Sequence, residues 1–182
     1  MQKGNFMKKL TLIISTVLLI SMLCACGGNS TDNTTIPKDT SPSSNTPNTA
    51  PTGYLFTYNG VQFGVDMAAD AVLTQLGEAK DKHTTESCAF GGDDTVYYYS
   101  SIQISTNNEL GYERIYSIYL EDDLVATEKG ICVGNTADDV RTAYGEPSAK
   151  STDTCLVYEK DGMSLSFNLT DGLVSTILYN DI

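Results

Sequence analysis

The sequence predicts an α+β fold of two tandem repeats, each a short helix packed on an antiparallel β-meander. The first observation is internal similarity, because residues 60–79 and 130–147 both open with Gly-x-x-x-Gly and both reach a Gly-Glu pair near their end. The second is a helical spacing of apolar residues between these markers. The third is that alternating, strand-like segments follow each copy. A repeat of about 70 residues is too long for a solenoid and suits two α+β units.

Two segments related to export precede the repeats, which are expected at 54–123 and 124–182. Residues 1–25 have the layout of a secretory signal peptide, in which two lysines precede an apolar stretch and small residues follow it. The apolar stretch at 10–23 is short for a transmembrane helix. We therefore expect a cleaved signal rather than a membrane span.

The cleavage region, Leu-Cys-Ala-Cys-Gly at 23–27, resembles the lipobox of bacterial lipoproteins. This resemblance implies transfer of diacylglycerol to the thiol of Cys26, cleavage after Ala25 and acylation of the new amino group. Residues 26–53 would then form a disordered tether, because they are rich in Ser, Thr, Asn and Pro and contain almost no apolar side chains. The expected location is the extracytoplasmic face of the cell membrane, with attachment through the lipid.

The charge balance excludes some classes of partner. Loss of residues 1–25 removes three lysines and no acid, so the mature chain would carry 8 basic and 23 acidic residues. Nucleic acids and anionic lipid surfaces attract Lys and Arg, so neither is an expected partner. With one His and no Cys-x-x-Cys, the chain also has too few ligands for a zinc site, and we expect no metal or other cofactor.

In repeat 1 we expect Asp66 to cap a helix that ends at Gly77. Residues 95–106 alternate apolar and polar side chains and are expected to form one strand. It would pair with a second strand at 113–121 across the turn-rich segment 106–111.

In repeat 2 the helix is expected to begin at Thr136, with Asp139 completing a capping box, and to end at Gly145. Asp-Gly pairs at 161–162 and 171–172 are strong hairpin turns, because Gly adopts positive φ without strain. These turns separate three expected strands, at 155–160, 163–170 and 173–180.

The pattern of repeat 2 resembles the tandem-repeat fold of the β-lactamase inhibitor protein family and of the small lipoproteins of the outer-membrane assembly machinery. The residues that carry this resemblance are Gly134, Thr136, Asp139 and Val140 at the helix start, 144–147 at its stop, and Asp171, Gly172, Val174 and Ile177 in the meander. The resemblance implies a helical layer against a sheet whose concave face binds another protein, and it implies no enzyme activity. Likeness at this level supports a fold more than a function.

Tyrosines supply the candidate binding residues. The chain has eleven Tyr and no Trp, and several Tyr alternate with Ser on expected strands, a composition typical of protein-binding surfaces. We expect Tyr97, Tyr99, Tyr116 and Tyr158 on an exposed face of the sheet. The alternative is that cross-strand packing alone accounts for them, since Tyr is a favoured strand residue.

Cys132 offers an alternative function, because it lies in Gly-x-Cys-x-Gly, the outline of a nucleophile elbow. The aligned position in repeat 1 is Gln62, so the glycine frame persists without a thiol. His83 is the only candidate base. A buried or disulfide-bonded role for Cys132 is therefore favoured over catalysis.

Three cysteines follow the lipobox, and an odd number cannot all pair within one chain. Cys132 and Cys155 lie 23 residues apart in one repeat, and an exported protein permits a disulfide. The β-lactamase inhibitor family carries a comparable bond, so the resemblance favours this pair. Pairing of Cys88 with Cys155 is the competing arrangement.

These observations predict a lipid-anchored extracytoplasmic protein that binds another protein through a tyrosine-rich sheet face. The alternatives are an envelope enzyme that uses Cys132 or His83, and a passive structural component of the envelope. A polar pocket joining His83 to Cys132 would favour the enzyme. A sheet face without exposed aromatic side chains would favour the passive component.

Overall fold

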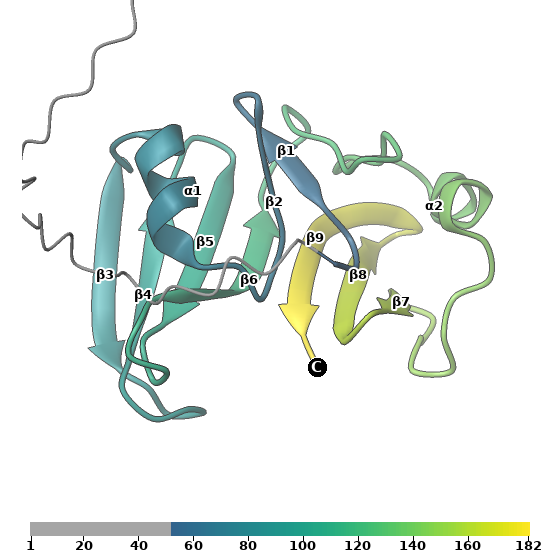
Figure 1. Cartoon of the computed structure of the whole chain (residues 1–182). Helices are drawn as coiled ribbons and strands as arrows, with labels where there is room; N and C mark the ends of the chain where they lie inside the picture. The colour runs from purple at the N-terminus through teal and green to yellow at the C-terminus, as the bar shows by residue number, and fades with distance from the viewer. Residues whose placement is uncertain (1–51) are drawn as a thin grey trace, which may run out of the picture. The chain divides into compact units, whose positions relative to one another are not determined.

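The computed structural model describes residues 52–182, which form two antiparallel sheets and two helices (Figure 1). The elements in chain order are β1 (Phe56–Tyr58), β2 (Val61–Phe63), α1 (Ala69–Leu76), β3 (Asp81–Glu86), β4 (Asp93–Tyr98), β5 (Ile102–Asn107), β6 (Arg114–Leu120), α2 (Ala137–Tyr144), β7 (Cys155–Lys160), β8 (Met163–Thr170) and β9 (Leu173–Asp181). The smaller sheet is the β1–β2 hairpin, and the larger has the order β3-β4-β5-β6-β9-β8-β7. Neither described helix is long and apolar enough to cross a membrane.

The predicted fold class is wrong. The domain is mainly β, and its strands form one continuous seven-stranded sheet instead of two separate helix-on-meander repeats. The meanders β3–β6 and β7–β9 join where β6 pairs with β9, from Ser117 opposite Asn180 to Leu120 opposite Ile177. The physical reason is that each meander alone would leave an apolar strand with unpaired backbone groups at its edge, and pairing the two edges satisfies both.

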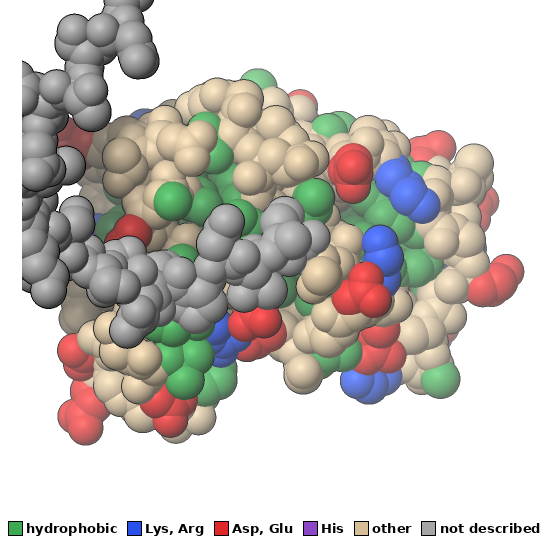
Figure 2. All heavy atoms as spheres, viewed as in Figure 1, with side chains coloured by type: hydrophobic (Ala, Val, Ile, Leu, Met, Phe, Trp, Pro, Cys, Tyr) green, Lys and Arg blue, Asp and Glu red, His purple; other side chains and the backbone are tan. Residues whose placement is uncertain are grey.

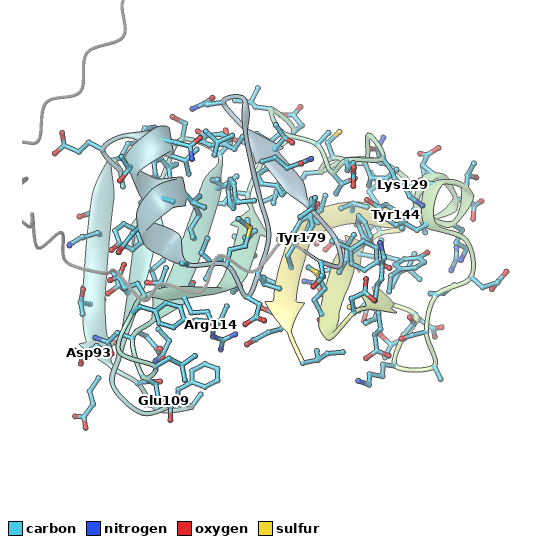
Figure 3. The ribbon with its side chains drawn as sticks, viewed as in Figure 1. Asp93, Glu109, Arg114, Lys129, Tyr144 and Tyr179 are labelled. Atoms are coloured by element: carbon cyan, nitrogen blue, oxygen red, sulfur yellow. The ribbon has the colours of Figure 1, made fainter. Side chains whose placement is uncertain are left out.

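Arg114, at the start of β6, also links the two meanders (Figure 3). Its Nη1 lies 2.5 Å from Oδ2 of Asp181 at the end of β9 and 3.1 Å from Oδ1 of Asp66. Burial alone would lower the pKa of Arg114, but hydrogen bonds and charges, first of Asp181 and then of Asp66, raise it. The guanidinium therefore stays charged, and it holds the ends of β6 and β9 together.

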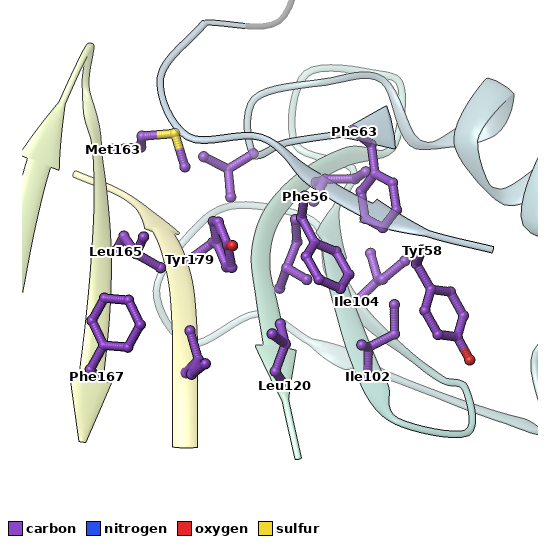
Figure 4. Packing of buried hydrophobic residues seen from close by; sticks show 14 of the residues in the cluster. Phe56, Tyr58, Phe63, Ile102, Ile104, Leu120, Met163, Leu165, Phe167 and Tyr179 are labelled. Atoms are coloured by element: carbon purple, nitrogen blue, oxygen red, sulfur yellow. The ribbon is translucent and has the colours of Figure 1, made fainter. Parts of the chain in front are cut away.

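One face of the large sheet forms the core. A row of paired residues crosses every strand on this face: Lys82, Tyr97, Ile104, Ile118, Tyr179, Leu165 and Tyr158. The β1–β2 hairpin covers the middle of the row with two fully buried rings, Phe56 and Phe63 (Figure 4). Phe56 lies 5.8 Å from Tyr179, centroid to centroid, and the same distance from Phe63. A single apolar core therefore spans both meanders.

The segment expected as one strand at 95–106 is a hairpin. β4 ends at Tyr98 and β5 begins at Ile102, with the N–H of Tyr99 donating to the carbonyl of Ile102 at 2.9 Å. The expected strand at 113–121 does form, as β6, and it pairs with β5. The edge strand β3 had not been predicted, because all six of its side chains are exposed and show no apolar alternation.

The hairpin turns of the second meander are confirmed. Asp161 and Gly162 have φ of 49° and 81°, and Asp171 and Gly172 have φ of 53° and 78°. These pairs of positive φ values characterise type I′ turns, whose twist matches that of the flanking strands.

The α2 helix begins and ends as predicted. The Thr136 hydroxyl accepts a hydrogen bond from the N–H of Asp139, the Asp139 carboxylate accepts one from the N–H of Thr136, and the helix ends at Gly145 with φ of 85°. In α1 the end at Gly77 is also confirmed, but the predicted cap is wrong. Ala68 occupies the N-cap position, and Asp66 instead donates its N–H to the carbonyl of Ile115 on β6.

Replacing Thr136 by alanine is expected to lower the free energy of unfolding by about 1 kcal/mol, because the first turn of α2 loses its capping oxygen. Urea denaturation at pH 7 measures this. Thr74→Ala is the matched control, since Thr74 is an exposed helical threonine of α1 without a capping role. Equal losses in the two variants would contradict the importance of the cap.

The same variant should change the response to acid. Hydrogen bonds from the Thr136 side chain and backbone lower the pKa of Asp139. A lowered folded-state pKa stabilises the fold above the unfolded value of about 4, and this contribution disappears as the pH falls through the folded pKa. The loss of stability below about pH 4 should therefore be smaller in Thr136→Ala than in the wild type.

Candidate binding face of the seven-stranded sheet

The second face of the large sheet carries two uninterrupted rows of side chains. Strand side chains alternate between faces, so these rows lie opposite the core row. The first row is Asp81, Tyr98, Gln103, Tyr119, Leu178, Ser166 and Val157. The second row is His83, Val96, Ser105, Ser117, Asn180, Ser164 and Glu159. We call these two rows the open face.

No helix or hairpin of residues 52–182 packs on the open face. The β1–β2 hairpin and α1 lie on the other side of the sheet, toward the viewer in Figure 1. Tyr98, Tyr119 and Leu178 are partly exposed and do not contribute to the core. Phe90, in the loop between β3 and β4, reaches only the end of the face, where its ring lies 5.3 Å from that of Tyr116.

The composition of the open face suits recognition of a protein. Tyr98 and Tyr119 flank Gln103 in the first row, with Leu178 beside them, and the second row is mostly Ser and Asn. Tyrosine offers contact area at a low entropic cost together with a hydroxyl for hydrogen bonding, and small polar residues adapt to a partner. A salt bridge of 2.5 Å with Lys150 offsets the charge of Glu159 at one end.

Two of the predicted binding tyrosines are on the wrong face. Tyr97 and Tyr99 lie beside the core, and they line a cleft of about 390 Å³ between α1 and the β3–β4 hairpin. The Tyr97 hydroxyl donates to the Glu113 carboxylate at 2.8 Å, and burial followed by this hydrogen bond raises the pKa of Tyr97 well above its usual value. The Tyr99 hydroxyl donates to the carbonyl of Gly77 at 3.2 Å. Tyr99 therefore ties the end of α1 to the sheet, and Tyr97 ties β4 to the residue before β6.

Tyr158 is a core residue, not the exposed one that was predicted. It is only 4% exposed, its ring lies 5.3 Å from that of Tyr144, and its hydroxyl donates to the carbonyl of Gly145 at 3.1 Å. Tyr158 therefore anchors the end of α2 to the sheet, which explains its position without a partner.

Tyr116 is the one predicted tyrosine on the open side. It is the extra residue of a β-bulge in β6, where the register with β5 shifts. Burial and then the Asp94 carboxylate raise the pKa of Tyr116, and its hydrogen bond with Ser105 opposes this shift. Ser105 belongs to the second row, so Tyr116 extends the open face toward Phe90.

The structure does not bring together the residues of the predicted enzyme alternative. His83 lies on β3, an outer strand of the sheet, whereas Cys132 contacts Asn135 in the loop before α2, which bonds to β9. The Cys132 thiol lies 3.3 Å from Oδ1 of Asn135, which offers it no base. In residues 52–182 no group of His, Cys, Asp and Glu side chains has the arrangement of a metal site.

The cysteines of the domain are thiols. Cys88 is exposed, Cys132 and Cys155 are half-buried, and all three are free. Neither disulfide expected from the sequence is therefore formed in this structure. Burial raises the pKa of Cys155, which favours its protonated form. The predicted lipidation site, Cys26, lies outside the described residues.

Comparison with known proteins gives no family. No protein-family model matches the chain, and no curated protein matches it. One solved structure that resembles it is the 1.5 Å crystal structure of an extracellular protein containing a SCP domain from Bacillus anthracis str. Ames. The identity is 13% and the TM-score is 0.39, over 64% of this chain and 44% of that one. The chain thus spans less than half of that protein, and a likeness at this level carries no conclusion about fold or function.

Sequence reasoning missed Tyr98, Tyr119 and Leu178, which form the centre of the open face. A signal for Tyr98 was present in the Ser100-Ser101 pair, which lies in the turn between β4 and β5. Ending the strand there leaves Tyr98 opposite Gln103 and Tyr97 opposite Ile104. Because faces alternate along a strand, the strongly apolar partner Ile104 then identifies Tyr97 as the inward residue.

Proposed function

We propose that this protein is a lipid-anchored extracytoplasmic module that binds another protein through the open face. The lipobox at 23–27 and the polar tether that follows support the anchoring. Both lie outside the described residues, and the fold of 52–182 neither requires nor opposes them.

The observation that carries the proposal is the row of Tyr98, Gln103, Tyr119 and Leu178 on a face that no described element covers. Antiparallel sheets commonly expose one face to water, but that face is then usually polar. Here two tyrosines and a leucine stand at its centre, which favours a contact surface over a passive component of the envelope. For the catalytic alternative, the Cys132 thiol contacts Asn135 and the candidate base His83 lies on β3.

The charge of the chain indicates the kind of partner. With 23 acidic and 11 basic residues, the chain is strongly negative. Figure 2 shows the side opposite the open face, which carries several exposed acidic side chains. Complementary charges steer association and reject partners of like charge. The partner is therefore expected to present Lys and Arg around an apolar or aromatic centre.

Photo-cross-linking in intact cells tests the proposal. A cross-linking side chain at position 103, between Tyr98 and Tyr119, is expected to give a discrete adduct with one protein. The control position is 124, because Leu124 is 79% exposed and lies off the sheet in the loop after β6. Adducts that are the same at both positions, or absent from both, would contradict a binding role for the open face.

A further inference from the structure

The two outer strands of the large sheet differ in what occupies their free edges. On β7 the edge is closed by the chain that precedes it. The N–H of Ser148 donates to the carbonyl of Val157 at 2.7 Å, the N–H of Val157 donates to Oγ of Ser151 at 2.8 Å, and the N–H of Thr152 donates to the carbonyl of Cys155 at 2.8 Å. Another strand cannot add to β7 without displacing these bonds.

On β3 no strand of residues 52–182 pairs with the free edge. The N–H of Ser87 donates to the carbonyl of Gly92 at 3.0 Å, and the six residue pairs between β3 and β4 continue that register without a bulge. In an antiparallel ladder the bonding residues alternate, so positions 81, 83 and 85 bond to β4, and Lys82, Thr84 and Glu86 direct their backbone groups outward. The outward N–H of Lys82 donates to Oδ1 of Asp81 at 2.8 Å, so a pairing strand would exchange this local bond for one to its own carbonyl. All six side chains of β3 are exposed.

The outward residues form a self-complementary pattern of charge, Lys82-x-Thr84-x-Glu86. We propose that β3 pairs antiparallel with β3 of a second copy of this chain, about a two-fold axis at Thr84. In that register Thr84 faces Thr84 of the other copy, and Lys82 of each copy faces Glu86 of the other. Symmetry produces each Lys–Glu pair twice, and every outward backbone group of these three residues finds a partner.

Other registers fit less well. A slip of one residue would place Lys82 opposite Thr85, whose backbone groups already bond to β4. It would also place Asp81 opposite Glu86, so that like charges face each other. A slip of two residues would place Lys82 opposite Thr84, without an opposite charge, and Glu86 opposite Lys80, whose N–H already donates to the carbonyl of Tyr98 at 2.8 Å. The two-fold register at Thr84 alone combines complete backbone bonding with opposite charges.

The charges also explain why an open edge is tolerated. Exposed edge strands invite aggregation, and charged side chains on them normally prevent it. Lys82 and Glu86 oppose pairing with an apolar strand but not with a copy of β3.

The contact between the two β3 strands is small, so association is expected to be weak and concentration-dependent. Pairing would join the open faces of two copies into one continuous sheet, so the dimer would offer two binding surfaces for the partner proposed above. The pairing itself does not depend on that function.

Charge reversal tests the proposal on the full-length chain in detergent. Lys82→Glu and Glu86→Lys should each raise the dimer dissociation constant about tenfold in sedimentation velocity at 0.15 M salt, since both symmetric pairs become repulsive. The double variant restores opposite charges and should dimerise as the wild type does. An equimolar mixture of the two single variants should form heterodimers, because each supplies the charge that the other lacks.

Cysteine cross-linking tests the register. In a Cys88→Ser background, Thr84→Cys should form a covalent homodimer under mild oxidation, because residues paired at the axis have Cα atoms about 5.5 Å apart. Thr85→Cys is the matched control, since its two copies would be diagonal neighbours about 7–8 Å apart. Three results would each overturn the proposal, whether or not the open face captures a partner. These are equal cross-linking of the two cysteine variants, a double charge variant that dimerises as weakly as the single ones, and a wild type that remains monomeric at about 1 mM.

Discussion

Replacing Phe56 by alanine is expected to lower the free energy of unfolding by about 4 kcal/mol, the range for large aromatic side chains in a core. Phe56 is fully buried, and its ring lies 5.8 Å from that of Tyr179 and 6.5 Å from that of Tyr58. Tyr179 is in turn paired with Ile118 across the junction of β6 and β9. The cavity would therefore open where the two meanders meet.

The expected loss is large compared with the stability of the whole domain. Domains are stable by only about 5–15 kcal/mol, so the variant should lose a large part of its stability. Thr57→Ala is the matched control, because Thr57 is the exposed neighbour on β1 and its change should stay within about 0.5 kcal/mol. Urea denaturation followed by circular dichroism measures both. A Phe56→Ala variant as stable as Thr57→Ala would show that the hairpin is dispensable to the core.

The elements predicted correctly from the sequence are those whose signals are local. Thr136 and Asp139 cap α2 through side chains three residues apart, and Gly145 ends it in a backbone conformation that favours glycine. The two Asp-Gly turns likewise fix their hairpins through two adjacent residues. None of these features depends on contacts with distant parts of the chain.

The arrangement of the sheet could not be predicted in this way, because the pairing of β6 with β9 joins residues about 60 positions apart. The repeat pattern indicated two similar units and gave no sign that their strands share one sheet. The β1–β2 hairpin was different, since its turn at Asn59-Gly60, with φ of 50° and 81°, is a strong local signal that the Gly-x-x-x-Gly alignment obscured.

The candidate site shows how one turn changes the assignment of a face. Extending one strand through residues 99–101 put Tyr97 and Tyr99 on the exposed side, whereas the turn places Tyr98 there. Side chains alternate with a period of two, so a single misplaced reversal exchanges the two faces. The tyrosine-rich composition of the open face was therefore predictable from the sequence, but the identity of its residues depended on the register.

Replacing Tyr98 and Tyr119 together by alanine is expected to reduce the adduct formed from position 103 at least tenfold. Central tyrosines of an interface commonly contribute about 2 kcal/mol each, and two of them correspond to an affinity loss of about a hundredfold or more. The fold should persist, because both side chains are partly exposed and neither belongs to the core. The urea midpoint of the double variant checks this directly.

Tyr112→Ala is the matched control for this experiment, since Tyr112 is a partly exposed tyrosine in the turn between β5 and β6, away from both rows. It should leave the adduct unchanged. A double variant that stays folded and still gives the full adduct would show that position 103 lies near a partner that the open face does not recognise. The binding surface would then be sought among the loops, where Leu110 and Leu124 are the most exposed of the large apolar side chains between β5 and α2.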